Sequence, residues 1–247
     1  MHVRLLSCLA ACFLLAGTVP PSHADALSPE QKSAVDQLVH DYLMNHPEVI
    51  IDALKASQHD KEERSAEQTR NAIAEQHARL YSDPDSPVGG NPQGNVSIIE
   101  FFDYRCPYCK EVEPSLEALL KEDPNLRIIY KEFPILGPAS VYAARVALAA
   151  RRQGKYDAFH RSMMAKKGKI DEDVVLETAA SVGLDIDKLK ADLLAPEIGG
   201  IIQRDYDLAE ALEIQGTPAF VVGDTLVPGV ADIATLRRLV RDARQGG

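Results

Sequence analysis

The feature that most constrains this chain is a pair of cysteines separated by two residues, Cys106 and Cys109. An apolar, β-prone segment (residues 96–102) precedes the pair, and Pro107 suits the first turn of a helix. We therefore expect the pair at the junction between a buried strand and a helix N-terminus. Free backbone N–H groups and the helix dipole favour a negatively charged sulfur there, so Cys106 is predicted to be an exposed nucleophile with a lowered pKa. Cys109, one turn later, could then resolve a mixed disulfide formed at Cys106.

The N-terminus has the pattern of a secretory signal peptide. Arg4 precedes an apolar run (residues 5–17), and the small residues of Ser22-His23-Ala24 follow at the spacing of a cleavage site. The alternative is a membrane anchor, but the run is shorter than the ~20 apolar residues that a spanning helix needs. We predict a signal peptide over residues 1–24 and a periplasmic location. A second possible cleavage site follows Ala26.

Removal of this signal takes away the other two cysteines, Cys8 and Cys12. A lipoprotein processing box could end at Cys12, but apolar residues continue beyond it, so we do not expect a lipoprotein. A structural disulfide between Cys106 and Cys109 would close a very small loop and stabilise little through chain entropy, which favours a redox-active disulfide. Zinc would need two further ligands, and the spacing of His160 does not demand that role, so neither a metal nor a cofactor is expected.

Charge excludes one class of partner. The chain carries a net charge of −10 at pH 7 with neutral histidines, whereas proteins that bind nucleic acids carry a basic footprint. We therefore expect no nucleic-acid partner.

The rest of the chain divides into three parts. Residues 25–82 are predicted to be helical, and Ser28-Pro29-Glu30-Gln31 is a helix start with an N-cap, a first-turn proline and a glutamine for a capping box. Residues 83–95 are rich in proline and glycine and are predicted to be a linker. Residues 96–245 then read as strand, helix, strand, a block of helices at about 137–212, a hairpin and a final helix. This order predicts an α/β domain with a helical insertion.

The motifs of the third part resemble the DsbA family of thioredoxin-fold oxidoreductases. The resemblance covers about residues 94–244 and is carried by the segment 98–109, by Gly216-Thr217-Pro218-Ala219-Phe220, and by segments 131–134 and 153–160. It implies a thioredoxin fold with an inserted helical domain. It also implies that Pro218 has a cis peptide bond and faces the cysteines, and that Thr217 and Pro218 bind the substrate's backbone.

The resemblance assigns roles to residues around the cysteines. Glu100 would be a buried acid that relays protons to or from Cys109, although a partly exposed strand residue is the alternative. Pro107 and Tyr108 would tune the redox properties of the pair. Because Tyr108 stands where the archetypal DsbA oxidase has a histidine that stabilises the thiolate, Cys106 is expected to be less oxidising here.

The whole sequence most resembles ScsC-like members with an N-terminal oligomerisation segment. Residues 25–82 are predicted to form a helical stalk that assembles a homo-oligomer, possibly a trimer; the alternative is a helix packed on its own catalytic domain. We expect a disulfide isomerase or reductase that acts on cysteine-containing exported proteins and is kept reduced by a DsbD-like membrane partner. The alternatives are a monomeric oxidase recycled by a DsbB-like partner, and a copper(I)-binding or chaperone protein.

Overall fold

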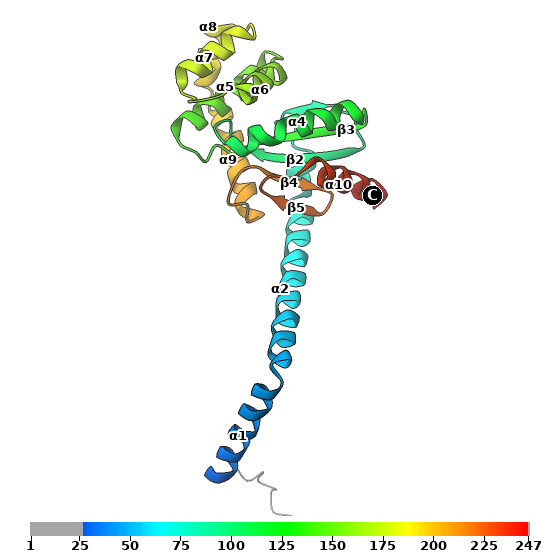
Figure 1. The fold of residues 1–247 in the computed structure, drawn as a ribbon. Coiled ribbons are helices and arrows are strands. Elements are labelled where there is room, and N and C mark those ends of the chain that lie inside the picture. Colours follow the sequence, from blue (N-terminus) through cyan, green and yellow to red (C-terminus); the bar gives the residue numbers. More distant parts are fainter. Residues whose placement is uncertain (1–26, 247) are drawn as a thin grey trace, which may run out of the picture. The chain divides into compact units, whose positions relative to one another are not determined.

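The computed structural model describes residues 27–246, so the predicted signal peptide, residues 1–24, lies outside the described residues. The chain divides into two compact units with their boundary between His59 and Asp60. The first unit holds helix α1 (Pro29–Asn45) and the beginning of helix α2 (Pro47–Glu75), which Figure 1 draws in blue to cyan. No helix within residues 27–246 is long and apolar enough to cross a membrane.

Helix α1 begins as its sequence predicts. The Ser28 hydroxyl accepts a hydrogen bond from the Gln31 N–H at 3.2 Å, and the Gln31 side chain accepts one from the Ser28 N–H at 2.8 Å. This reciprocal capping box satisfies two donors that the helix itself leaves unpaired. The helix ends at Asn45, and Pro47 begins α2.

The apolar side chains of the first unit are exposed. None of the residues of α1, all of which are described, is buried. Large apolar side chains with more than a third of their surface exposed follow each other along α1 and the start of α2: Val35, Leu38, Val39, Tyr42, Met44, Val49, Ile50, Ile51 and Leu54. A helix that leaves such residues uncovered has an apolar surface available for a partner.

The second unit begins earlier than we predicted. We expected residues 25–82 to be one segment separate from the domain, but the end of α2 and helix α3 (His77–Tyr81) belong to the second unit. Ile73 and Leu80 are buried there against Ile99 and Phe101 of the central strand. These two large apolar residues account for the difference, because burying them on the sheet removes apolar surface from water.

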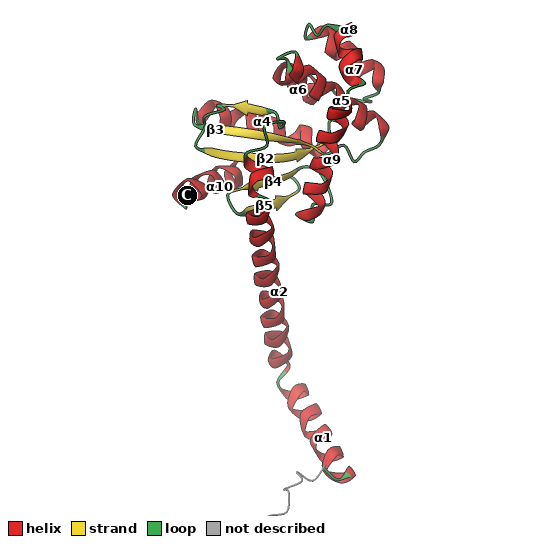
Figure 2. Ribbon diagram, turned by 180° about the vertical axis from the view of Figure 1, so that it is seen from behind, coloured by secondary structure: helices red, strands yellow, loops and turns green. Residues whose placement is uncertain are grey.

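The second unit contains a five-stranded sheet, drawn in yellow in Figure 2. Its strands are β1 (Val88–Gly90), β2 (Val96–Phe102), β3 (Leu126–Glu132), β4 (Ala219–Val222) and β5 (Thr225–Pro228), in the order β1-β3-β2-β4-β5. The pair β2–β3 is parallel and the other pairs are antiparallel. All 7 residues of the central strand β2 are buried, which explains its nearly continuous apolar sequence.

The segment predicted as a linker, residues 83–95, contributes to this sheet. Val88–Gly90 forms the edge strand β1 and pairs with β3, with Val88 opposite Ile129. The strand escapes a sequence pattern because it is short and two of its three residues are glycines. A side chain at Gly89 would meet the Tyr130 ring at 2.8–3.3 Å, so the close approach of this ring requires a glycine.

Helices cover the sheet on both faces. Helices α4 (Pro107–Glu122) and α10 (Ile233–Gln245) pack with Ile98 and Phe102 of β2, while Ile99 and Phe101 face the end of α2 and α3. Because side chains alternate along a strand, Glu100 points to the same face as Ile98 and Phe102, beneath α4.

Five helices lie between β3 and β4 in the sequence and form the predicted insertion, shown in green to orange in Figure 1. They are α5 (Pro138–Arg152), α6 (Tyr156–Ala165), α7 (Glu172–Ser181), α8 (Ile186–Leu193) and α9 (Pro196–Ala211). The predicted α/β fold with an inserted helical domain and an N-terminal helical segment is confirmed.

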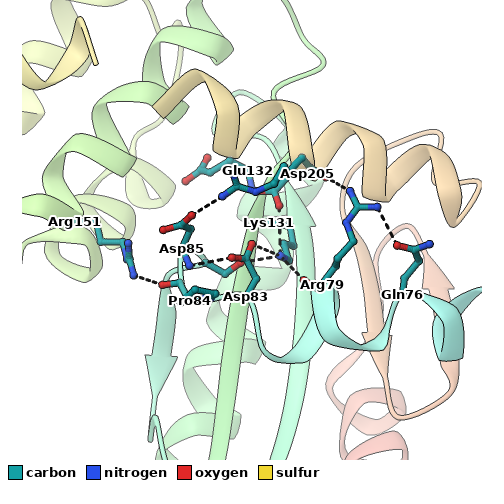
Figure 3. A network of polar contacts seen from close by, with 11 residues as sticks. Gln76, Arg79, Asp83, Pro84, Asp85, Lys131, Glu132, Arg151 and Asp205 are labelled. Carbon is teal, nitrogen blue, oxygen red and sulfur yellow. Dashed lines mark hydrogen bonds and ion pairs between the residues drawn. The ribbon is translucent and has the colours of Figure 1, made fainter. Parts of the chain in front are cut away.

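A buried polar network ties this insertion to the sheet (Figure 3). Lys131 of β3 is 1% exposed, and its ammonium group lies 3.4 Å from carboxylate oxygens of both Asp83 and Asp205, the latter on α9. The same group donates hydrogen bonds to the Ser86 hydroxyl at 2.7 Å and to the Arg79 carbonyl oxygen at 2.8 Å. The network thus joins α3, the segment before β1, strand β3 and α9 around one buried cation.

Candidate functional site: the Cys106–Cys109 pair

The structure places the two cysteines where the sequence predicts them. Cys106 is the N-cap residue of α4, in extended conformation, and Pro107 is the first residue of the helix. Cys106 is 4% exposed, Cys109 is completely buried, and both are free thiols. Strand β2 and helix α4 therefore enclose both sulfurs, and Cys106 is almost wholly covered rather than exposed as we expected, because the turn at Thr217 lies against it.

The two thiols have different surroundings, which shift their pKa values in opposite directions. The Cys109 thiol donates a hydrogen bond to the Cys106 sulfur and is the main cause that lowers the pKa of Cys106 to about 5. Thr217 and the N–H groups of Cys109 and Tyr108 act in the same direction, while burial opposes them. Burial raises the pKa of Cys109 far above its usual value, and the hydrogen bond to Cys106 and the charge of Glu100 raise it further. Cys106 is thus ionised at neutral pH, and Cys109 keeps its proton.

The segment around Thr217 lies directly against Cys106, although 111 residues separate them in sequence. The Thr217–Pro218 peptide bond is cis, as the resemblance implies. In its protonated form the Cys106 thiol donates a hydrogen bond to the Thr217 carbonyl oxygen at 3.2 Å. The Gly229 N–H donates to the Pro218 carbonyl oxygen at 2.8 Å and connects this turn to the end of β5.

A pocket of about 520 Å³ adjoins this turn. Gly216, Thr217 and Pro218 line it on one side, and Gln68 and Thr69 of α2 line it on another. Tyr108 of the motif is 58% exposed. The turn and Tyr108 are therefore both accessible to a polypeptide that approaches Cys106.

Glu100 is completely buried, and neither of its carboxyl oxygens has a hydrogen-bond partner. Burial raises its pKa well above the usual value, and the nearby charges of Glu113 and Cys106 raise it further. The structure therefore excludes the alternative of a partly exposed strand residue. An unpartnered buried carboxyl group is costly to the fold, which is a reason to consider a role in proton transfer.

Sequence reasoning missed a second pair of titratable groups beside Glu100. Glu113 of α4 lies with its Oε2 3.7 Å from His160 Nε2, and the Nδ1 of His160 lies 3.1 Å from the Tyr104 hydroxyl. His160 is completely buried, and the polar atoms of Glu113 and His160 that face each other have no hydrogen-bond partner. The available signal was the spacing, because Glu113 follows Cys109 by four residues and so shares its face of the helix.

Within residues 27–246, no cluster of three or more histidine, cysteine or acidic side chains could hold a metal ion. The arrangement around Cys106 consists of two thiols of different acidity, a buried carboxyl group and a turn that presents a carbonyl oxygen. Such a set can exchange a disulfide with another molecule.

Comparison with known proteins identifies the two parts of the chain separately. Residues 97–241 match the family of DSBA-like thioredoxin domains. Residues 31–64 match the N-terminal domain of the copper resistance protein ScsC.

Solved structures agree with both matches. A thioredoxin-like oxidoreductase from Silicibacter pomeroyi DSS-3 is 48% identical, has a TM-score of 0.67 and covers 69% of this chain and 98% of its own. Proteus mirabilis ScsC in a transitional conformation is 31% identical, has a TM-score of 0.66 and covers 90% of this chain and 99% of its own.

Curated relatives include longer proteins. The Na⁺/H⁺ antiporter NhaA 3 of Salinispora tropica is 30% identical over 164 residues, which are 65% of this chain and 25% of that protein. This chain thus spans about a quarter of the length of that relative. The matched domain and the similarity to ScsC over 90% of the chain confirm the predicted family: the chain belongs to the DSBA-like thioredoxin domains and carries an N-terminal segment of the ScsC type.

Proposed function

We propose that this protein is a periplasmic thiol–disulfide oxidoreductase that acts on cysteines of exported proteins through Cys106 and Cys109. The observation that carries this proposal is the contact of the Cys106 sulfur with the Thr217 carbonyl oxygen at 3.2 Å, combined with a Cys106 pKa of about 5. An ionised sulfur is the nucleophile of disulfide exchange, and the adjacent turn offers backbone groups to an extended substrate.

The reaction has two exchange steps. The Cys106 thiolate attacks one sulfur of a substrate disulfide, forms a mixed disulfide and releases the other substrate sulfur as a thiolate. Cys109 then loses its proton and attacks the Cys106 sulfur, which forms the Cys106–Cys109 disulfide and releases the second substrate thiolate. The substrate gains two electrons and the protein loses two. When a substrate thiolate resolves the mixed disulfide instead, the substrate is isomerised without net electron transfer.

Glu100 has a defined task in this scheme. The Cys109 thiol is buried and strongly disfavours ionisation, so its attack requires a nearby proton acceptor. Glu100 lies beneath the pair on β2 and has no other partner. We assign Glu100 as the group that accepts the Cys109 proton in the second step and returns it when the disulfide is reduced.

We propose that the protein works mainly as an isomerase or reductase and that α1 and the start of α2 assemble it into a homo-oligomer such as a trimer. The support is the ScsC-type match over residues 31–64 together with the exposed apolar side chains of α1. Several catalytic pairs held in one particle could act on the same misfolded substrate. This role requires a membrane partner of the DsbD type that keeps the cysteines reduced.

A monomeric oxidase is the second candidate, and the low pKa of Cys106 favours it. Stabilising the Cys106 thiolate stabilises the reduced form and makes the disulfide more oxidising. An oxidase would depend on a DsbB-like partner for reoxidation. A copper(I)-binding role would use the same two thiolates, but the described residues hold no group of three or more histidine, cysteine or acidic side chains that could complete such a site.

One experiment separates these functions. The mature chain is mixed with scrambled ribonuclease and with reduced ribonuclease, and recovery of ribonuclease activity is followed in both. We expect efficient recovery of the scrambled substrate by the reduced protein, and its loss in Cys106→Ala. Recovery of the reduced substrate alone, by the oxidised protein, would identify an oxidase, and failure with both substrates would reject the proposal.

A further inference from the structure

A basic pocket of about 340 Å³ lies beside the catalytic motif in this acidic protein. It is formed by the β2–α4 loop, the first turns of α4 and the loop between α6 and α7. Its lining includes Arg105, Pro107, Lys110, Lys166, Lys167 and Lys169. Five of these six side chains are cationic, and Pro107 directly follows the nucleophilic cysteine.

Three of the cations have local partners. The Lys110 ammonium group donates to the carbonyl oxygens of Met163 at 2.7 Å and of Lys166 at 3.0 Å, so it holds the end of α6 against α4. Arg105 donates to the Leu136 carbonyl oxygen. Lys169 lies 3.2 Å from an Asp171 carboxylate oxygen and is 82% exposed at its side chain, so solvent screens this pair.

The remaining cations have no charged partner. Within residues 27–246, Lys166 and Lys167 form no ion pair with an acidic side chain, and Lys167 is exposed. Arg105 and Lys110 donate to neutral carbonyl groups, so no carboxylate neutralises them, although burial lowers the pKa of Lys110 to about 8. The pocket therefore presents a net positive charge, although the chain as a whole carries −10.

The pocket also differs from the one at the cis-proline turn. The pocket lined by Gly216, Thr217 and Pro218 shares no lining residue with the basic pocket. A polypeptide whose cysteine reaches Cys106 thus has two separate surfaces to contact, and an extended chain covers roughly 3.3 Å per residue. Residues a few positions from the reacting cysteine can reach the lysines of the α6–α7 loop.

We propose that the basic pocket binds an acidic segment next to the reacting cysteine of the polypeptide substrate, with Lys166, Lys167 and Lys169 as its contacts. This proposal rests on the proposed disulfide exchange and adds a substrate preference to it. Clustered like charges on a protein of opposite net charge attract a complementary partner, and such attraction mainly accelerates encounter. Because solvent-exposed charges carry the effect, salt should weaken it.

The test compares substrates that differ in charge alone. Short peptides with one intramolecular disulfide are made with three aspartates, three asparagines or three lysines beside one cysteine. The rate at which the reduced full chain becomes oxidised by each peptide is measured in stopped flow. We expect the acidic peptide to react roughly fivefold faster than the neutral one at low ionic strength, and the two rates to converge in about 0.5 M salt.

Two triple variants, which remove the same number of positive charges, show whether the preference for the acidic peptide depends on the lysines of the basic pocket. Lys166→Gln, Lys167→Gln and Lys169→Gln together should bring the rates of the acidic and neutral peptides to within about twofold of each other. The matched control, Lys121→Gln, Lys188→Gln and Lys190→Gln, should keep the preference of the natural sequence. These three lysines lie on α4 and α8, outside the pocket.

The outcomes separate the two proposals. If all three peptides are reduced at the same rate, or if both triple variants lose the preference equally, the basic pocket does not select acidic segments, while disulfide exchange stands. If none of the peptides is reduced, the proposed exchange itself fails and this substrate preference fails with it.

Discussion

At the scale of single residues, the site gives two chemically identical thiols different pKa values through their different environments. Cys106 gains hydrogen bonds at the start of α4, and Cys109 is enclosed one turn later with Glu100 beneath it. One sulfur is thus ready to attack, whereas the other needs help to lose its proton. The following two predictions address these two halves of the site.

The first prediction concerns the pH dependence of Cys106. Because its pKa lies at about 5, the thiolate is fully formed above about pH 6, and its population falls tenfold per pH unit well below pH 5. Alkylation of the reduced protein with iodoacetamide, read by mass spectrometry, should be independent of pH between about 6 and 8. An alkylation rate that rises up to about pH 8.5, as for an ordinary thiol, would show that the site does not activate Cys106.

The second prediction concerns Glu100. Glu100→Gln keeps the shape of the buried side chain but removes the proton acceptor, so resolution of the mixed disulfide by Cys109 should slow by about 10- to 100-fold. Cys106 alkylation should remain fast, which distinguishes a proton-transfer role from a general loss of structure. The lifetime of the mixed disulfide in rapid-quench experiments measures the effect. Glu111→Gln, an exposed change on α4, is the control, and an equal effect in both variants would refute the assignment.

The sequence was sufficient for the residues of the motif but not for those brought in by the fold. Cys106, Cys109 and Pro107 could be placed because their roles depend on local spacing along one strand and one helix. Thr217 required a resemblance, since no local pattern reveals a partner 111 residues away. The contact of His160 with Glu113 also depends on the packing of α6 against α4, which periodicity does not determine.

At the scale of elements, most of the predictions that failed concern segments with weak local signals. The strand β1 consists of Val88 and two glycines, so its structure is decided by pairing with β3 rather than by its own residues. The end of α2 is charged and alanine-rich, and Ile73 is its one buried residue, so little in its sequence marks its membership of the second unit. Contacts with residues far away in the sequence decide both the strand β1 and the place of the end of α2, and a local sequence pattern does not reveal such contacts.

The third prediction concerns the element junction around Lys131. Lys131→Met removes a buried ammonium group and leaves the carboxyl groups of Asp83 and Asp205 without their cation, which should destabilise the fold by about 3–5 kcal/mol. Burial already raises the pKa of Asp205 to about 7, so at lower pH this group can take up a proton and become neutral. The loss of stability should therefore be larger at about pH 8 than at about pH 5.5.

Urea unfolding at the two pH values measures this difference. Lys188→Met, which breaks an exposed ion pair with Asp192, is the control and should cost no more than about 1 kcal/mol. Equal stability losses for Lys131→Met and Lys188→Met would mean that the buried network contributes nothing special to the junction.

At the scale of the whole molecule, the chain combines a catalytic domain with a helical unit that buries none of the residues of α1. Their sequence signatures match two different families, and their functions are separable in the proposed scheme. In that proposal the catalytic domain performs the exchange, and the helical unit determines how many such domains act together.

The fourth prediction tests this division. Deletion of residues 27–59 should convert an oligomer into a monomer, because it removes the exposed apolar side chains of α1 and the start of α2. Light scattering gives the mass, and Cys106 alkylation should be unchanged because the second unit keeps its core. Substituting Leu38 and Tyr42 by glutamate in the full chain should have the same effect on mass. A natural chain that is already monomeric would contradict the proposed assembly.

The central claim is that Cys106 attacks and Cys109 resolves. Its most direct test is trapping of the mixed disulfide with a disulfide-containing protein substrate, using Cys109→Ala and Cys106→Ala side by side and mass spectrometry of the covalent complex. The account predicts a stable complex through Cys106 in Cys109→Ala and none in Cys106→Ala. Equal trapping by both variants, or trapping by Cys106→Ala alone, would contradict it.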